Sequence, residues 1–168
     1  MFLPSWPCMW EVERIGRMGD GGKFTCGLPR LAQTRGKDLV VFSIGVEKES
    51  SWEYEVLERT DANIYMFDFS VDEVGVSSAP AATHTVPESD VLLRSSPRIQ
   101  QYGPQLQAAP KSISSRAHFN KVGFGARDEN VGGNQFWTLR TMMKHAGVDW
   151  IDILKVHTAL PLPNLHDL

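Results

Sequence analysis

A continuous apolar segment, residues 39–44 (Leu-Val-Val-Phe-Ser-Ile), constrains the fold more than any other feature of this sequence. Its lack of alternation between apolar and polar residues is typical of a strand buried on both faces of a parallel sheet. A helix is predicted from Ser50 to Arg59, because Ser50 and Glu53 have the spacing of a capping box. Residues 62–67 predict a second buried strand. Strand, helix and strand together predict a βαβ unit, and therefore an α/β fold.

Further elements are predicted on both sides of this unit. The glycine-rich segment at residues 19–22 (Gly-Asp-Gly-Gly) predicts a turn between two short strands, because glycine accepts positive φ without steric cost. Two more strands are expected at residues 118–124 and 150–156. Between them we predict a helix that Asn134 caps and that Gly147 ends. The sheet would then hold about four parallel strands with flanking helices.

Composition excludes several classes of protein. The formal net charge of −3 is too balanced for a nucleic-acid-binding surface. No apolar run approaches the roughly 20 residues that cross a bilayer, so no transmembrane segment is expected. The first ten residues lack the basic start and apolar middle of a signal peptide, which favours a cytoplasmic location. No histidines or cysteines have metal-ligand spacing, so we expect no metal site.

Two cysteines, Cys8 and Cys26, are too few for a disulfide scaffold. They lie close enough in sequence to form one bridge if the chain folds in an oxidising compartment. Without an export signal, two reduced and partly buried thiols are at least as well supported. The sequence leaves both interpretations open.

Candidate binding residues follow the two strands of the βαβ unit, since ligands bind beyond the carboxyl ends of parallel strands. Gly45 follows the first strand and would let the backbone approach a ligand closely. Asp68 ends the second strand about twenty residues later, where it can accept hydrogen bonds from a ribose diol. This pattern indicates a nucleoside-containing cofactor, although the three glycines of a dinucleotide site and the motif of a phosphate loop are missing. The alternative for Asp68 is a solvated strand end or a helix cap.

Four blocks of sequence resemble a methyltransferase-like family, the methyltransferase domain 24 type. The first block contains R-I-G and G-D-G-G-K-F-T-C and lies at residues 8–26. The second is V-F-S-I-G with S-W-E at residues 41–53, and the third is I-Y-M-F-D at residues 64–68. The fourth, D-W-I-D-I-L-K-V at residues 149–156, is also similar to the FkbM-type methyltransferases.

The resemblance implies a class I, Rossmann-like methyltransferase fold that binds S-adenosyl-L-methionine and acts on an unknown methyl acceptor. Carried over by position, it implies that Ser43 and Gly45 belong to the loop that holds the methionine part of the cofactor. It also implies that Asp68 binds the ribose hydroxyls. Glu53 belongs to the motif and is counted with these cofactor-binding candidates. No catalytic residue is assigned.

The resemblance predicts three parts of the chain. They are a family-signature segment (1–36), a partial methyltransferase domain (37–156) and a divergent tail (157–168). Serine, proline and alanine dominate the stretch at about 71–116, which is typical of a loop insertion.

The sequence departs from the family after the last predicted strand. The family continues K-V-D-I-E-G, whereas this chain continues from Lys155 and Val156 into His157-Thr158-Ala159. The family's carboxylates and later strands are missing, so the chain has the pattern of a C-terminally truncated, incomplete sheet. An alternative function is therefore an inactive half-domain that binds cofactor or another protein. The unpaired apolar edge of the last strand would also favour self-association.

Overall fold

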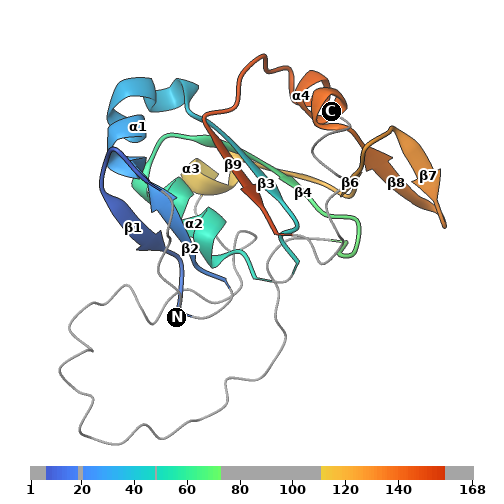
Figure 1. Ribbon diagram of the computed structural model, residues 1–168, viewed down its shortest axis with the longest axis horizontal. Coiled ribbons are helices and arrows are strands. Elements are labelled where there is room, and N and C mark those ends of the chain that lie inside the picture. The colour runs from blue at the N-terminus through green and yellow to red at the C-terminus, as the bar shows by residue number, and fades with distance from the viewer. Residues whose placement is uncertain (1–6, 19–20, 48, 73–110, 158–168) are drawn as a thin grey trace, which may run out of the picture.

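A central sheet of four parallel strands organises the chain, in the order β5-β4-β3-β9 (Figure 1). The computed structural model describes residues 7–18, 21–47, 49–72 and 111–157. The strands are β3 (Val40–Ile44), β4 (Asn63–Phe67), β5 (Ala117–Asn120) and β9 (Ile153–Val156). The predicted α/β fold with about four parallel strands is confirmed, and the arrangement is Rossmann-like.

The position of β3 explains its unbroken apolar sequence. It lies inside the sheet, paired with β4 on one side and with β9 on the other. Val41 packs in the core on one face of the sheet, and Phe42 packs in the core on the opposite face. Neither residue is exposed, so both faces of β3 exclude water.

Different elements cover the two faces. Beside Val41 lie α1 (Leu28–Arg35), α2 (Ser51–Arg59) and the short α3 (Lys111–Ser114). The antiparallel hairpin of β1 (Val12–Ile15) and β2 (Lys23–Cys26) packs on the same side, as the glycine-rich turn predicted. The helix α4 (Leu139–Ala146) covers the face that carries Phe42. Helix α1 was not predicted from the sequence.

The segment between β5 and α4 differs from the prediction. The predicted strand at 118–124 is divided, because β5 ends at Asn120 and β6 (Gly123–Phe124) belongs to a second sheet. This sheet has the order β6-β8-β7, with β7 at Glu129–Val131 and β8 at Asn134–Trp137. Asn134 therefore begins a strand and caps no helix. Thr138 caps α4 instead, because its side chain accepts a hydrogen bond from the Thr141 amide.

The predicted capping box at α2 is wrong. Ser50 occupies the N-cap position, but its side chain makes no capping hydrogen bond. Glu53 is fully buried and bonds to residues outside the helix. A buried carboxylate gains more from a cation and a hydroxyl than from one backbone amide at the helix start.

Cys8 and Cys26 form a disulfide, with their Cα atoms 6.0 Å apart. The bridge joins the residues before β1 to the last residue of β2. The structure thus decides between the two interpretations that the sequence left open. Within the described part of the chain, no helix has the length and apolar character to span a membrane.

Most of the predicted insertion falls on residues 73–110, and the predicted tail falls on residues 158–168. Both segments lie outside the described residues. The division of the chain into three parts therefore stays a prediction.

Candidate functional site

The candidate residues meet at the carboxyl edge of the central sheet. Gly45 directly follows β3, and Asp68 directly follows β4. Because Ile44 pairs with Phe67 in parallel register, the two candidates occupy neighbouring positions along this edge. The Gly45 amide donates a hydrogen bond to the Phe67 carbonyl at 2.9 Å.

The Asp68 carboxylate connects the loops that follow β3 and β4. Its Oδ2 atom accepts a hydrogen bond from the Glu47 amide at 2.7 Å. Its Oδ1 atom accepts from the Ser70 amide at 2.8 Å and from the Ser70 hydroxyl at 2.6 Å. Asp68 is only 5% exposed. A carboxylate offers about four acceptor positions, so one on Oδ2 remains for a further donor.

Glu47 lies in the loop after β3 with a φ of 53°. Among the described residues it is the one non-glycine with positive φ. Such a conformation costs about 1–3 kcal/mol, and residues of this kind concentrate at ligand-binding loops. The hydrogen bond from its amide to Asp68 helps to hold Glu47 in this conformation.

Gly45 is required by a contact within the chain. Its φ is 72°, and a Cβ atom at this position would collide with the carbonyl oxygen of His157. The His157 amide donates to the Ile44 carbonyl at 2.8 Å, which continues the pairing of β9 with β3. The backbone that approaches Gly45 closely is therefore that of His157. A cofactor contact at Gly45 stays a prediction.

Ser43 and Glu53 lie beneath this loop in a buried polar cluster with Lys155. The Ser43 hydroxyl donates to Glu53 Oε1 at 2.5 Å, and Lys155 Nζ lies 3.2 Å from the same oxygen. Lys155 Nζ also donates to the Gly45 carbonyl at 2.9 Å. The side chains of Lys155 and Glu53 are 9% and 1% exposed. Through Lys155, the cluster thus holds the Gly45 carbonyl in place.

Lys155 was not among the cofactor-binding residues predicted from the sequence, although it lies near the end of the last predicted strand. Its signal is the register of β3 with β9, which places Lys155 opposite Ser43. That register becomes visible only when the order of the strands is known, because the two residues lie far apart along the chain. The second carboxylate oxygen of Glu53, Oε2, is buried and has no hydrogen-bond partner among the described residues.

Known proteins match only part of this chain. Residues 2–83, just under half of its length, match the family model of a methyltransferase domain. No curated protein and no solved structure matches the chain. The matched segment contains the strand–helix–strand unit with Ser43, Gly45, Glu53 and Asp68. This match supports a methyltransferase family for the chain.

Proposed function

We propose that this chain is an S-adenosyl-L-methionine-dependent methyltransferase domain of the methyltransferase domain 24 type, related to the FkbM-type enzymes. The observation that carries the proposal is the adjacent placement of Gly45 and Asp68 at the carboxyl edge of β3 and β4. Both residues belong to the segment that supports a methyltransferase family.

The topology favours a ligand at this edge. From β3 the chain proceeds to β4 and β5 on one side, and β9 then pairs on the other side of β3. The strand order therefore reverses beside β3. Ligands of open parallel sheets bind in the crevice outside the carboxyl ends of the strands at such a switch point.

The residues present fit an adenosyl cofactor in two respects. Asp68 keeps one acceptor position, which suits a ribose hydroxyl, while its other positions hold the loops in place. The residues from Gly45 to Glu47 form the loop that would lie against the methionine part. Ser43 and Glu53 are fully buried, so in this proposal they act on the cofactor by supporting that loop.

S-adenosyl-L-methionine supplies a methyl group on a sulfonium, which is transferred by in-line displacement. The contribution of this chain is to hold the reacting groups in alignment. An oxygen or nitrogen acceptor would also need a base for its proton. The proposal assigns no residue to that role.

Isothermal titration of the full chain with S-adenosyl-L-methionine tests the proposal. We expect binding by the unmodified protein and a loss of at least about tenfold in affinity for Asp68→Ala, or roughly 1.4 kcal/mol. Asp68→Asn provides a second variant, since its amide oxygen can still accept from the Glu47 amide. Asp72→Ala is the matched control, because Asp72 is exposed and its carboxylate pairs with Lys121. Folded protein that gives no heat, or an Asp68→Ala chain with unchanged affinity, would sink the proposal.

A second candidate is an interaction module that associates through β9 without methyl transfer. Within the described residues β9 pairs only with β3, so its other edge has no strand partner. Leu154 and Val156, both on β9, are 47% and 39% exposed. An unpaired edge with apolar side chains is a template for pairing with another strand. This observation favours self-association as the function of the edge.

Sedimentation velocity over a range of protein concentrations tests this candidate. We expect a monomer–dimer equilibrium that Leu154→Lys shifts toward the monomer. Val131→Lys is the control, because Val131 is an exposed strand residue of the other sheet. A protein that stays monomeric at every concentration contradicts the candidate. So does a dimer that both substitutions weaken equally.

A further inference from the structure

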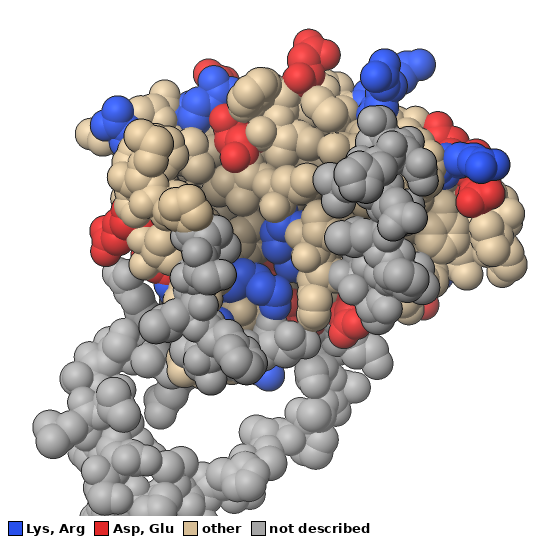
Figure 2. All heavy atoms as spheres, in the orientation of Figure 1, with Lys and Arg blue, Asp and Glu red and all other residues tan. Residues whose placement is uncertain are grey.

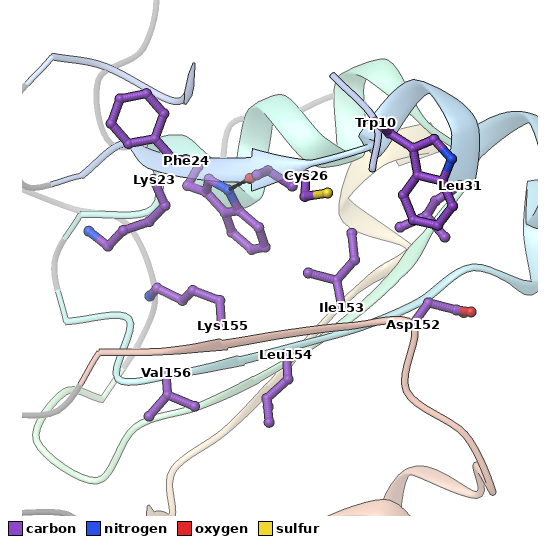
Figure 3. A pocket seen from close by; sticks show the side chains of 12 residues that line it. Trp10, Lys23, Phe24, Cys26, Leu31, Asp152, Ile153, Leu154, Lys155 and Val156 are labelled. Carbon is purple, nitrogen blue, oxygen red and sulfur yellow. Dashed lines mark hydrogen bonds between the residues drawn. The ribbon is translucent and has the colours of Figure 1, made fainter. Parts of the chain in front are cut away.

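A cleft lies beside β9, between the strand and the N-terminal hairpin (Figure 3). The cleft has a volume of about 520 Å³, and neither Gly45 nor Asp68 lines it. Small-molecule sites usually measure about 300–1,000 Å³. Its walls come from β2, α1, α2 and β9, which meet here although they are distant in sequence.

The middle of the cleft is apolar. Leu31 from α1 and Ile153 from β9 both line it, and in Figure 3 the Ile153 side chain points from β9 into the space below the hairpin. Trp52 from α2 contributes to the lining, and its ring N–H donates to Thr25 Oγ1 at 3.0 Å. Trp52 is only 1% exposed, and because its N–H already has a partner, the small part of the indole that reaches the cleft is apolar. The hydrogen bond also fixes the hairpin against α2.

The two ends of the cleft differ in charge. Lys23 and Lys155 extend their ammonium groups toward the same end, as Figure 3 shows. The space-filling view shows basic side chains inside a hollow on this face (Figure 2). Asp152 lies at the opposite end, where its carboxylate is 2.9 Å from Arg35 Nε. The acidic end is thus compensated by an arginine. At the other end Lys155, although paired with Glu53, and Lys23 bring two ammonium groups to the cleft, which suits an anionic ligand.

Lys155 has a donor left for a ligand. An ammonium group carries three N–H bonds. One donates to the Gly45 carbonyl and another is directed at Glu53 Oε1. The third can reach into the cleft that the lysine lines. Because the Lys155 side chain is only 9% exposed, a hydrogen bond to an anionic oxygen here is weakly screened by water.

We propose that this cleft binds a small molecule with an apolar, preferably aromatic, body and one carboxylate-like anionic group. The body lies between Leu31, Trp52 and Ile153, and the anionic group contacts Lys155. The proposal does not depend on the cofactor or on methyl transfer, because neither Gly45 nor Asp68 lines the cleft. The two sites adjoin at Lys155, which donates to the Gly45 carbonyl.

A pair of probes with the same body tests the charge requirement. Naphthaleneacetate carries a carboxylate, and naphthaleneacetamide is its neutral analogue. Titration of the full chain with each probe, in the absence of cofactor, should show at least about tenfold tighter binding of the acid. Failure of the acid to bind, or equal binding of the two probes, overturns the proposal.

Substitutions then locate the site. Lys155→Met should remove the preference for the acid, while Lys121→Met should leave it, since Lys121 is exposed and does not line the cleft. Ile153→Trp, which keeps the lysine and fills the middle of the cleft, should weaken both probes at least about tenfold. It also serves where Lys155→Met fails to fold. The proposal is overturned if Ile153→Trp leaves the affinity for both probes unchanged. It is also overturned if a folded Lys155→Met chain still prefers the acid.

Discussion

The backbone amide of Glu47 and the carboxylate of Asp68 are joined by a hydrogen bond of 2.7 Å. This bond ties the loop after β3 to the strand end after β4. It also helps to hold Glu47 at a φ of 53°, a conformation that a side chain disfavours. The edge of the sheet that we assign to the cofactor is therefore held by a charged hydrogen bond against local backbone strain.

Glu47→Gly should stabilise the protein by about 0.5–1 kcal/mol, because glycine relieves the positive φ and keeps the amide that bonds to Asp68. Part of the gain is offset by the greater freedom of glycine in the unfolded chain. Urea unfolding measures the change. Glu47→Ala is the control and should give no stabilisation, since alanine keeps the Cβ atom. A glycine variant less stable than the alanine variant contradicts this account of the loop.

Lys155→Met should destabilise the protein by about 3–5 kcal/mol, because it leaves the Glu53 carboxylate buried without its cation. The double variant Glu53→Gln/Lys155→Met should lose less than the sum of the two single losses. Lys121→Met removes an ammonium that is 51% exposed, and it should cost at most about 1 kcal/mol. Urea unfolding of the unmodified protein, Glu53→Gln, Lys155→Met and the double variant gives the coupling energy between Glu53 and Lys155. Strict additivity would show that the buried pair is not a unit.

Reduction of the Cys8–Cys26 bridge should lower the free energy of unfolding by about 3 kcal/mol, the value expected for a loop of this length. Cys26→Ser should lower it by a similar amount and make the protein insensitive to reductant. Thermal unfolding with and without reductant measures both. If the unmodified protein has the same melting temperature in both conditions, the bridge does not stabilise the fold in solution.

The protein should lose stability as the pH falls below about 6.5, in part through His118. Burial lowers the pKa of His118, whose ring stacks on Tyr65 with the centroids 4.9 Å apart. The unfolded chain therefore takes up this proton at a higher pH than the folded chain does. Stability is present above the ordinary pKa and is lost as the pH falls through the depressed value.

His118→Gln should reduce this loss of stability, because glutamine does not titrate. Denaturant unfolding of both proteins above and below pH 6.5 isolates the contribution of His118 from that of the carboxylates. An identical loss in the two proteins would show that His118 does not carry it.

The elements that local sequence determines were predicted well. Val41 and Phe42 pack on opposite faces of the sheet. Because both faces of this strand are buried, it has no solvent-facing positions at which polar residues would alternate with apolar ones. The adjacency of Gly45 and Asp68 follows from the parallel pairing of two consecutive strands. These features depend on neighbours in sequence or on one simple connection, so a sequence pattern is enough to predict them.

Other features depend on contacts that the pattern does not contain. Glu53 has the spacing of a capping residue, but Ser43 and Lys155 offer it buried partners from two strands. Asn134 begins a strand because Gly132 and Gly133, both with positive φ, turn the chain back on itself before it. A glycine pair before an asparagine is equally compatible with a loop and a capped helix. The outcome is decided by the pairing of β8 with its neighbours.

The contact between Gly45 and the His157 carbonyl couples two distant parts of the chain. A side chain at position 45 and the present course of the backbone after β9 are mutually exclusive. In any related sequence with a larger residue at this position, the chain must leave β9 along another path. In design, the segment after Val156 can be replaced by another sequence, provided that position 45 stays glycine wherever the carbonyl of residue 157 keeps its present place. The absence of a side chain at Gly45 thus determines the path that the backbone can take after β9.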